Sequence, residues 1–181
     1  MAENKRTRLR TRQDLIADTR EAATAFFRYA ERQPDEIWLE PTDAAGWNLR
    51  DHVAHVAWWD ISDIARMRDG ASQPRTLGIS DATWSKGIDP INEAIRAKTV
   101  DASPDAVRTL WRDTQAELFA LLESWPEKRY QAPAREVGFE DEGETRLIDV
   151  LGDLLGEHYR EHLGYITAIA SQRLIDLDAV P

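Results

Sequence analysis

Hydrophobic residues recur at intervals of three and four along four long stretches of this chain, which is the spacing of one face of an α-helix. Residues 11–32 form the first stretch, and Pro34 ends it. The second begins at Asn48, a favourable N-cap residue with Asp51 three positions later, and ends near Gly70. Both stretches therefore predict amphipathic helices of about twenty residues.

The third and fourth stretches also predict long helices. Ser103-Pro104-Asp105 combines an N-cap serine, a proline in the first turn and an acid near the helix start, and Pro126 ends that helix. The fourth stretch covers about residues 145–175. Its predicted core-facing stripe consists of Leu147, Val150, Leu151, Leu154, His158, His162, Tyr165, Ile166 and Ile169.

The connections between these stretches are long. Residues 71–89 and 126–144 contain several prolines and glycines, and a short helical piece follows from Asp89 to about Lys98. No run alternates apolar and polar residues for long enough to predict a strand. We therefore expect an all-α protein, a four-helix bundle with long crossover loops.

The composition narrows the class of protein. The chain has 181 residues, a net charge of −10 and no cysteine, so disulfides and thiolate chemistry are excluded. An acidic chain without a long apolar span or a signal sequence predicts a cytoplasmic protein that binds neither nucleic acid nor a membrane. We expect a flexible basic arm over residues 1–10, one domain over 11–175 and a tail over 176–181.

The chain has only four histidines, and they come from two of the predicted helices. His158 and His162 are four residues apart, so their side chains lie on the same face and could share a metal ion. A catalytic zinc site usually has three protein ligands, which makes His52 or His55 the third. The helical wheel slightly favours His52 but leaves both open. Two buried histidines that pack in the core are the structural alternative.

Residues 158–162 also match H-x-x-E-H, the inverted zinc-protease motif, in which Glu161 would be the general base. Those proteases are much longer and have an acidic third ligand well downstream of the motif. Only nineteen residues follow His162 here. We therefore consider peptidase activity a poor explanation of the motif.

The sequence GWNLRDHVAHVAW over residues 46–58 resembles the G-W-[ST]-[VL]-[RK]-[DE]-x-[VL]-x-H-[LIV]-A signature of the DinB-like superfamily. That superfamily includes the N-terminal domain of mycothiol-dependent maleylpyruvate isomerase. The H-x-x-x-H pair on the last helix is similar to that of the superfamily, and INEAI over residues 91–95 resembles the isomerase-type members.

The resemblance implies a bundle that holds a divalent metal, zinc or nickel most readily, on His55, His158 and His162. One of the two positions on the last helix is a glutamate in the isomerase branch, so this chain is closer to the three-histidine members. We also expect it to lack the isomerase's additional C-terminal domain, which weakens a maleylpyruvate assignment. The implied activities are thiol S-transfer and thiol-dependent isomerisation with mycothiol or bacillithiol. Other members protect against reactive natural products. The resemblance also implies a homodimer.

Our leading hypothesis is a metal-dependent enzyme that acts on a small electrophile. Glu161 and Asp60 are the candidate acids and bases. Candidates for contact with the substrate are Trp58, Trp59, Trp84, Asn92 and Trp111, although most tryptophans of a small domain pack in the core. Two alternatives are a non-catalytic or hydrolytic self-resistance protein that binds a natural product, and a structural dimer module without a small-molecule site.

Overall fold

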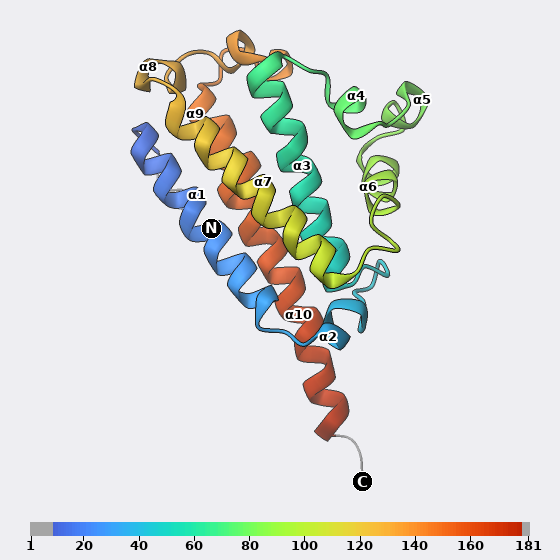
Figure 1. Cartoon of the computed structure of the whole chain (residues 1–181). Helices are drawn as coiled ribbons and strands as arrows, with labels where there is room; N and C mark the ends of the chain where they lie inside the picture. Colours follow the sequence, from blue (N-terminus) through green and yellow to red (C-terminus); the bar gives the residue numbers. More distant parts are fainter. Residues whose placement is uncertain (1–8, 179–181) are drawn as a thin grey trace, which may run out of the picture.

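A computed structural model describes residues 9–178, in which four long helices pack as a bundle (Figure 1). They are α1 (Arg12–Glu31), α3 (Leu49–Asp69), α7 (Pro104–Ser124) and α10 (His158–Asp178). Each helix contacts two neighbours: α1 packs on α7 and α10, and α3 packs on the same two helices from the other side. The predicted all-α bundle is confirmed.

The helix boundaries follow from local chemistry. Thr11 and Asn48 each form a capping box, in which the side chain accepts a hydrogen bond from the third helical N–H and the acid at that position accepts one in return. Ser103 caps α7 through the N–H of Ala106. Gly70 ends α3 in the left-handed region at φ 62°. These features explain why the predicted boundaries lie within a few residues of the observed ones.

The long connections contain short helices that the sequence pattern did not predict. They are α2 (Asp35–Leu39), α4 (Gln73–Leu77), α5 (Asp81–Trp84), α8 (Glu127–Tyr130), η1 (Ala134–Val137) and η2 (Glu140–Glu142), together with the predicted α6 (Ile88–Arg96). Each short segment is too brief to show helical periodicity. In residues 9–178 no β-strand forms, and Pro133 and Arg146 make an isolated bridge.

The α4–α6 excursion packs on the outer side of α3 (Figure 1) and has its own small core. That core consists of Leu77, Ile79, Ile91 and Ile95. The start of α3 also holds α6 by charge, because Arg96 donates to the buried Asp51 carboxylate at 3.0 Å and to the carbonyl of Gly46 at 2.6 Å. This attachment fixes α6 beside the first turns of α3.

The fourth predicted helix is interrupted by a wider turn. It divides into α9 (Leu147–Leu151), a π-helical turn η3 (Gly152–Glu157) and α10. A π turn contains more residues than an α turn and so changes which side chains face the bundle. Leu155 and Tyr159 are fully buried, whereas Leu154 and His158 face a pocket. The predicted core-facing stripe is therefore wrong at these two positions and at Tyr165, which is 44% exposed and also lines the pocket.

Close contact between α1 and the last helix depends on a glycine. A Cβ atom at Gly156 would overlap the carboxylate of Asp18 on α1. Asp18 forms an ion pair with Arg160, one turn further along the last helix. The missing side chain at position 156 thus allows α1 and α10 to approach closely just before the first histidine of α10.

The ends of the chain lie partly outside the described residues. Residues 1–8 of the predicted basic arm and residues 179–181 of the predicted tail fall in this group. Leu9 packs partly against the core, and the carbonyl of Arg10 accepts a hydrogen bond from Gln131 at 2.9 Å. Within the described range, no helix combines the length and the apolar character needed to cross a membrane.

Candidate functional site

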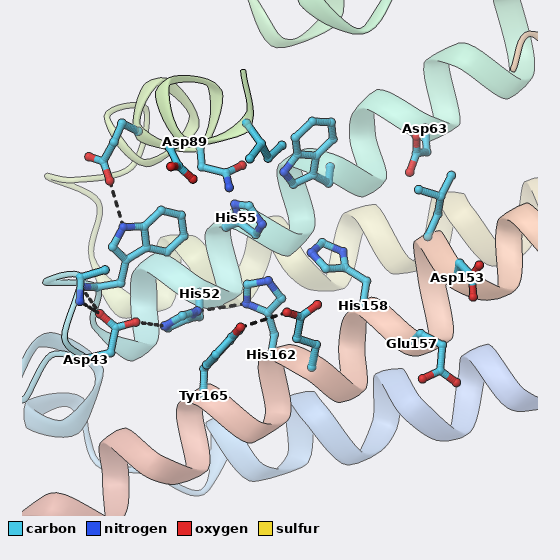
Figure 2. Close-up of a pocket in the computed structure, with 18 residues that line it drawn as sticks. Asp43, His52, His55, Asp63, Asp89, Asp153, Glu157, His158, His162 and Tyr165 are labelled. Carbon is cyan, nitrogen blue, oxygen red and sulfur yellow. Dashed lines mark hydrogen bonds and ion pairs between the residues drawn. The ribbon is translucent and has the colours of Figure 1, made fainter. Parts of the chain in front are cut away.

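A pocket of about 1030 Å³ opens between α3, α6, the η3–α10 segment and the loop that connects α2 to α3 (Figure 2). All four histidines of the chain line it. The other lining residues are Asp43, Ala45, Trp47, Trp59, Asp63, Ile88, Asp89, Asn92, Glu93, Asp153, Leu154, Glu157, Glu161 and Tyr165. Polar groups from four separate segments thus meet in one cavity, which is typical of a ligand site.

Three of the histidines form a compact cluster. His55 on α3 and His158 and His162 on α10 each offer a ring nitrogen, and these three atoms lie within 4.8 Å of one another. The ring centroids of His55 are 5.4 Å from His158 and 4.8 Å from His162. Figure 2 shows the three rings pointing toward a common volume from two facing helices. The helical spacing of four residues sets the α10 pair.

Burial keeps these imidazoles neutral. Desolvation lowers the pKa of His158 to about 4 and lowers the pKa values of His55 and His162 well below the ordinary value. Repulsion between the rings adds to this effect for His55 and His162. Neutral imidazoles carry the lone pairs that metal ions require, so the electrostatics of the cluster match those of a metal centre.

One atom in this cluster lacks a partner. Nδ1 of His55 is buried and accepts or donates no hydrogen bond within the described part of the chain. A buried polar atom without a partner destabilises the fold by roughly 1–3 kcal/mol. Three neutral imidazoles with an unpartnered ring nitrogen fit a divalent ion of the zinc, nickel, copper or iron type. Their role as ligands stays a prediction.

The fourth histidine, His52, contacts the cluster through a hydrogen bond to His162. Nε2 of His52 lies 3.2 Å from Oδ2 of Asp43, and Nδ1 of His52 lies 3.0 Å from Nδ1 of His162. A carboxylate only accepts hydrogen bonds, so Nε2 of neutral His52 carries the proton. Nδ1 of His52 then accepts the proton of His162 Nδ1, which leaves the lone pair of His162 on Nε2. This hydrogen-bond chain therefore selects the His162 tautomer.

Asp43 is itself held by its loop. Its Oδ1 atom accepts hydrogen bonds from the backbone N–H groups of Ala45 and Trp47, both at 2.9 Å. The backbone N–H of Asp43 donates to the carbonyl of Trp47 at 2.8 Å. The loop thus positions one carboxylate oxygen for its own turn and the other for His52. An aspartate three residues before a glycine indicates a turn, but nothing in the sequence indicates a histidine partner.

Comparison with known proteins identifies the family. The family model described as the DinB superfamily matches residues 18–166, which is most of the chain. The chain belongs to the DinB superfamily. The predicted family resemblance is therefore confirmed, and the crossover bundle described above is the DinB-like fold.

Two solved structures share the DinB-like fold. One is the colibactin self-resistance protein ClbS in complex with a double-stranded DNA, with a TM-score of 0.66 and 11% identity over 88% of this chain and 95% of that one. The other is a protein from Streptococcus pneumoniae, with a TM-score of 0.66 and 11% identity over 89% of this chain and 91% of that one. At this identity the likeness concerns the fold.

The ClbS complex corrects one sequence prediction. We expected no nucleic-acid partner because the chain is acidic, and that exclusion is wrong: a protein of the same fold was crystallised with double-stranded DNA. Net charge sums over every face of a molecule, so it does not exclude a local face that binds DNA.

Two relatives found by sequence are longer than the region that matches this chain. The uncharacterised protein Rv0036c of Mycobacterium tuberculosis strain H37Rv is 25% identical over 115 residues, which cover 64% of this chain and 43% of that protein. The uncharacterised protein MT0041 of strain CDC 1551 matches to the same extent. The match thus spans less than half of the length of these curated relatives.

The DinB pocket brings together some of the predicted site residues. His55, His158, His162, Trp59, Asn92 and Glu161 all line it. Of the two candidates for the third histidine, His55 joins the cluster, and His52 contacts it through His162. Glu161 accepts a hydrogen bond from the Tyr165 hydroxyl at 2.9 Å, which, together with burial, raises the pKa of Tyr165.

Other predicted site residues lie away from the pocket wall. Trp111 packs in the main core against Phe26, and Trp58 and Trp84 pack against the small core of the α4–α6 excursion. Asp60 is 1% exposed and accepts hydrogen bonds from Gln115 at 2.7 Å and from the Tyr159 hydroxyl at 2.9 Å. These four residues therefore have packing positions, and we assign them no contact with a ligand.

The structure also adds residues that sequence reasoning passed over. Trp47, just before the N-cap of α3, places its ring 5.2 Å from that of His55, and its indole N–H donates to Glu93 at 3.0 Å. The ring of Tyr165 stacks on His52 at 5.4 Å. Their aromatic character indicated packing, and only the assembled bundle shows which residues they pack against.

Proposed function

We propose that this DinB protein is a divalent-metal-dependent enzyme that acts on a small electrophilic substrate. It either transfers a thiol to this substrate or uses a thiol to isomerise it. The cluster of three neutral imidazoles, two of them buried, beside a pocket of about 1030 Å³ carries this proposal. His55, His158 and His162 would hold the metal. When bound, a divalent ion on imidazoles lowers the pKa of a thiol or water, so that a nucleophile is available near neutral pH.

The remaining residues of the pocket have supporting tasks. Asp43 and His52 keep the proton of His162 on Nδ1, which leaves Nε2 as the ring nitrogen for the metal. Glu161 stands on the pocket wall next to His162 and can accept a proton from a bound thiol or substrate. Trp59 and Tyr165 supply aromatic surface against which a substrate can pack.

A second candidate is a self-resistance protein that binds or hydrolyses a reactive natural product. The observation that favours it is the size of the pocket, about 1030 Å³, which lies at the upper end of the range for small-molecule sites. The fold neighbour ClbS is named as a colibactin self-resistance protein, which makes this function compatible with the bundle. The two candidates differ in whether a thiol is consumed.

The first experiment measures metal per chain in protein purified without a histidine tag or chelator. The wild type is compared with the His158→Ala/His162→Ala double variant, and Tyr165→Phe is the control at the same pocket. We expect about one metal per wild-type and control chain, and none in the double variant. A wild-type protein without metal, and without a rise in Tm on addition of zinc or nickel, would overturn the metal proposal.

The metal-loaded protein is then assayed with cysteine, mycothiol or bacillithiol and a chromogenic electrophile such as 1-chloro-2,4-dinitrobenzene. Thiol consumption that the double variant lacks supports the transferase function. Hydrolysis of the electrophile without thiol consumption, or ligand binding without turnover, favours the self-resistance function instead.

A further inference from the structure

The wall of the pocket has an unusual charge. Seven carboxylates line it, and among the described lining residues there is no lysine or arginine. These acids are Asp43, Asp63, Asp89, Glu93, Asp153, Glu157 and Glu161. A concave surface lined by one sign of charge focuses its field into the cavity.

Arginines behind the wall offset only part of this charge. Arg96 lies 3.6 Å from Glu93, and Arg160 lies 3.1 Å from Glu157. In contrast, the hydrogen bonds observed for Asp43 come from backbone N–H groups and neutral His52, and Glu161 accepts from a tyrosine hydroxyl. A divalent metal on the three histidines would neutralise two further charges. Asp43, Asp89 and Glu161 have no Lys or Arg partner within residues 9–178, so these three carboxylates alone leave the wall with a net negative charge when a divalent metal is bound.

Neutral groups in the pocket favour the same kind of ligand. Oδ1 of Asn92 is buried at the pocket wall and has no hydrogen-bond partner in residues 9–178, so it can accept from an N–H donor. Trp59 and Tyr165 present ring surface, and aromatic faces attract cations by about 0.5–2 kcal/mol. Acceptors, aromatic faces and carboxylates together match a cation.

We propose that the pocket selects substrates that carry a positive charge, of the class of organic ammonium or guanidinium compounds with an apolar body. This inference rests on the proposed function because it names the substrate class of the same site. It also separates this chain from the maleylpyruvate isomerase that it resembles, because a dicarboxylate would be repelled by the wall. The cationic end lies toward the carboxylates of the wall, and the apolar body lies along the aromatic rings that line it, of which Trp59 is one.

The test uses four probes of similar size and different charge. They are phenethylamine and benzyltrimethylammonium as cations, phenethyl alcohol as the neutral compound and 3-phenylpropionate as the anion. The quaternary ion cannot coordinate a metal, so its binding reports charge alone. Dissociation constants are measured by NMR titration of the full chain, with and without zinc. We expect both cations to bind about tenfold more tightly than the alcohol, and the anion to bind more weakly than the alcohol.

Two double variants locate the effect. Asp89→Asn/Glu161→Gln removes two wall charges, whereas Asp113→Asn/Glu117→Gln removes two exposed charges on α7. The first should reduce the preference for cations by about threefold or more, and the second should leave it unchanged. Raising sodium chloride from about 20 to about 300 mM should also reduce the preference, because salt screens exposed charges.

Equal binding of the cations and the alcohol, tighter binding of the anion, or no cation binding at millimolar concentration would overturn the inference. The measurement on metal-free protein separates this failure from that of the proposed function. A cation preference without any metal binding would leave the substrate class standing and remove the metal enzyme. Metal binding without a cation preference would do the reverse.

Discussion

Helix α3 carries buried polar groups on two different faces. One face borders the pocket, and the other borders the closed core of the bundle. His52 and His55 face the pocket, whereas Asp60, less than two turns later, faces Gln115 and Tyr159 inside the bundle. In the part of the chain that the structure describes, each site contains an atom without a hydrogen-bond partner: Nδ1 of His55 at the pocket, and Oδ1 of Asp60 in the core, where Oε1 of Gln115 on α7 also lacks one. An unpartnered atom beside a cavity can be satisfied by a ligand, whereas one in a closed core cannot.

This difference teaches that burial and polarity alone do not identify a functional residue. Desolvation disfavours the charged form in both places: it lowers the pKa of His55 and raises that of Asp60. Strongly perturbed pKa values are often taken as a sign of an active site. Here the cavity decides, because it adjoins the histidines and leaves Asp60 enclosed. The predictions below test this contrast.

The largest effect should come from His55→Ala. Removing one of three ligands should weaken zinc affinity by more than about 100-fold and abolish the rise in Tm that zinc produces in the wild type. Asp60→Asn, on the same helix, should leave both quantities unchanged. Competition with a fluorescent chelator gives the affinities. Equal losses in the two variants would mean that the contrast between the faces is wrong.

The second effect is the acid sensitivity of the metal-free protein. The pKa of His158 is about 4 in the folded protein and 6.5 ordinarily, so the unfolded chain takes up the proton first as the pH falls. Stability is therefore complete above pH 6.5 and is lost between about pH 6.5 and 4. His158 alone should lower the free energy of unfolding by about 2 kcal/mol between pH 7 and pH 5.

Urea denaturation at the two pH values measures this loss. In His158→Gln the loss should shrink, because the glutamine does not titrate. A wild-type protein whose stability does not change over this range would show that the histidines are not desolvated in solution.

Asp43→Asn should reverse the hydrogen-bond chain behind the cluster. The asparagine can donate an N–H to Nε2 of His52, so that Nδ1 of His52 carries the proton and donates to His162. The remaining proton of His162 then moves to Nε2 and blocks that nitrogen. We expect zinc affinity to fall by about 10- to 100-fold.

Asp89→Asn is the matched control, since it removes the same charge from the pocket wall without contacting a histidine. It should change zinc affinity by less than about threefold. Nitrogen-15 NMR of the histidine rings in the metal-free protein tests the tautomer directly. An unchanged His162 tautomer in Asp43→Asn would contradict this account, whatever the affinity.

The smallest effect should come from Asp60→Asn in the core. Burial raises the pKa of this carboxyl, so the folded state loses stability as the pH rises above 3.8, the ordinary value. An amide of the same shape carries no charge and should raise the free energy of unfolding by about 1 kcal/mol at pH 8. Denaturation at pH 8 measures it. A clear loss of stability would indicate that Asp60 has a partner beyond Gln115 and Tyr159.

Much of the fold and part of the candidate site could be predicted from the sequence. Periodicity and capping residues place α1, α3 and α7 within a few residues, because those signals are local. The spacing of four residues puts His158 and His162 on one face, and the family resemblance named His55, which the structure brings beside them. The resemblance was informative because it relates residues that are about 100 positions apart in the chain.

The remainder depends on tertiary contacts. The helical wheel favoured His52 because it treats each helix alone, whereas the pocket lies between α3 and α10. The π turn at η3 shifts Leu154 and His158 out of the core, and it leaves no clear mark in the apolar pattern. Asp43 becomes important only when its loop brings it to His52. Such contacts join segments whose separate sequences show no relation.

The missing side chain at Gly156 has a consequence for anyone who interprets variants of this gene. A side chain there would displace the carboxylate of Asp18 and disturb its ion pair with Arg160, which lies between the two histidines of α10. Such a variant would keep every histidine and every acid of the pocket. A prediction based only on the residues that line the pocket would therefore classify it as harmless. Position 156 belongs among the sensitive positions of the histidine cluster, although it contributes no atom to it.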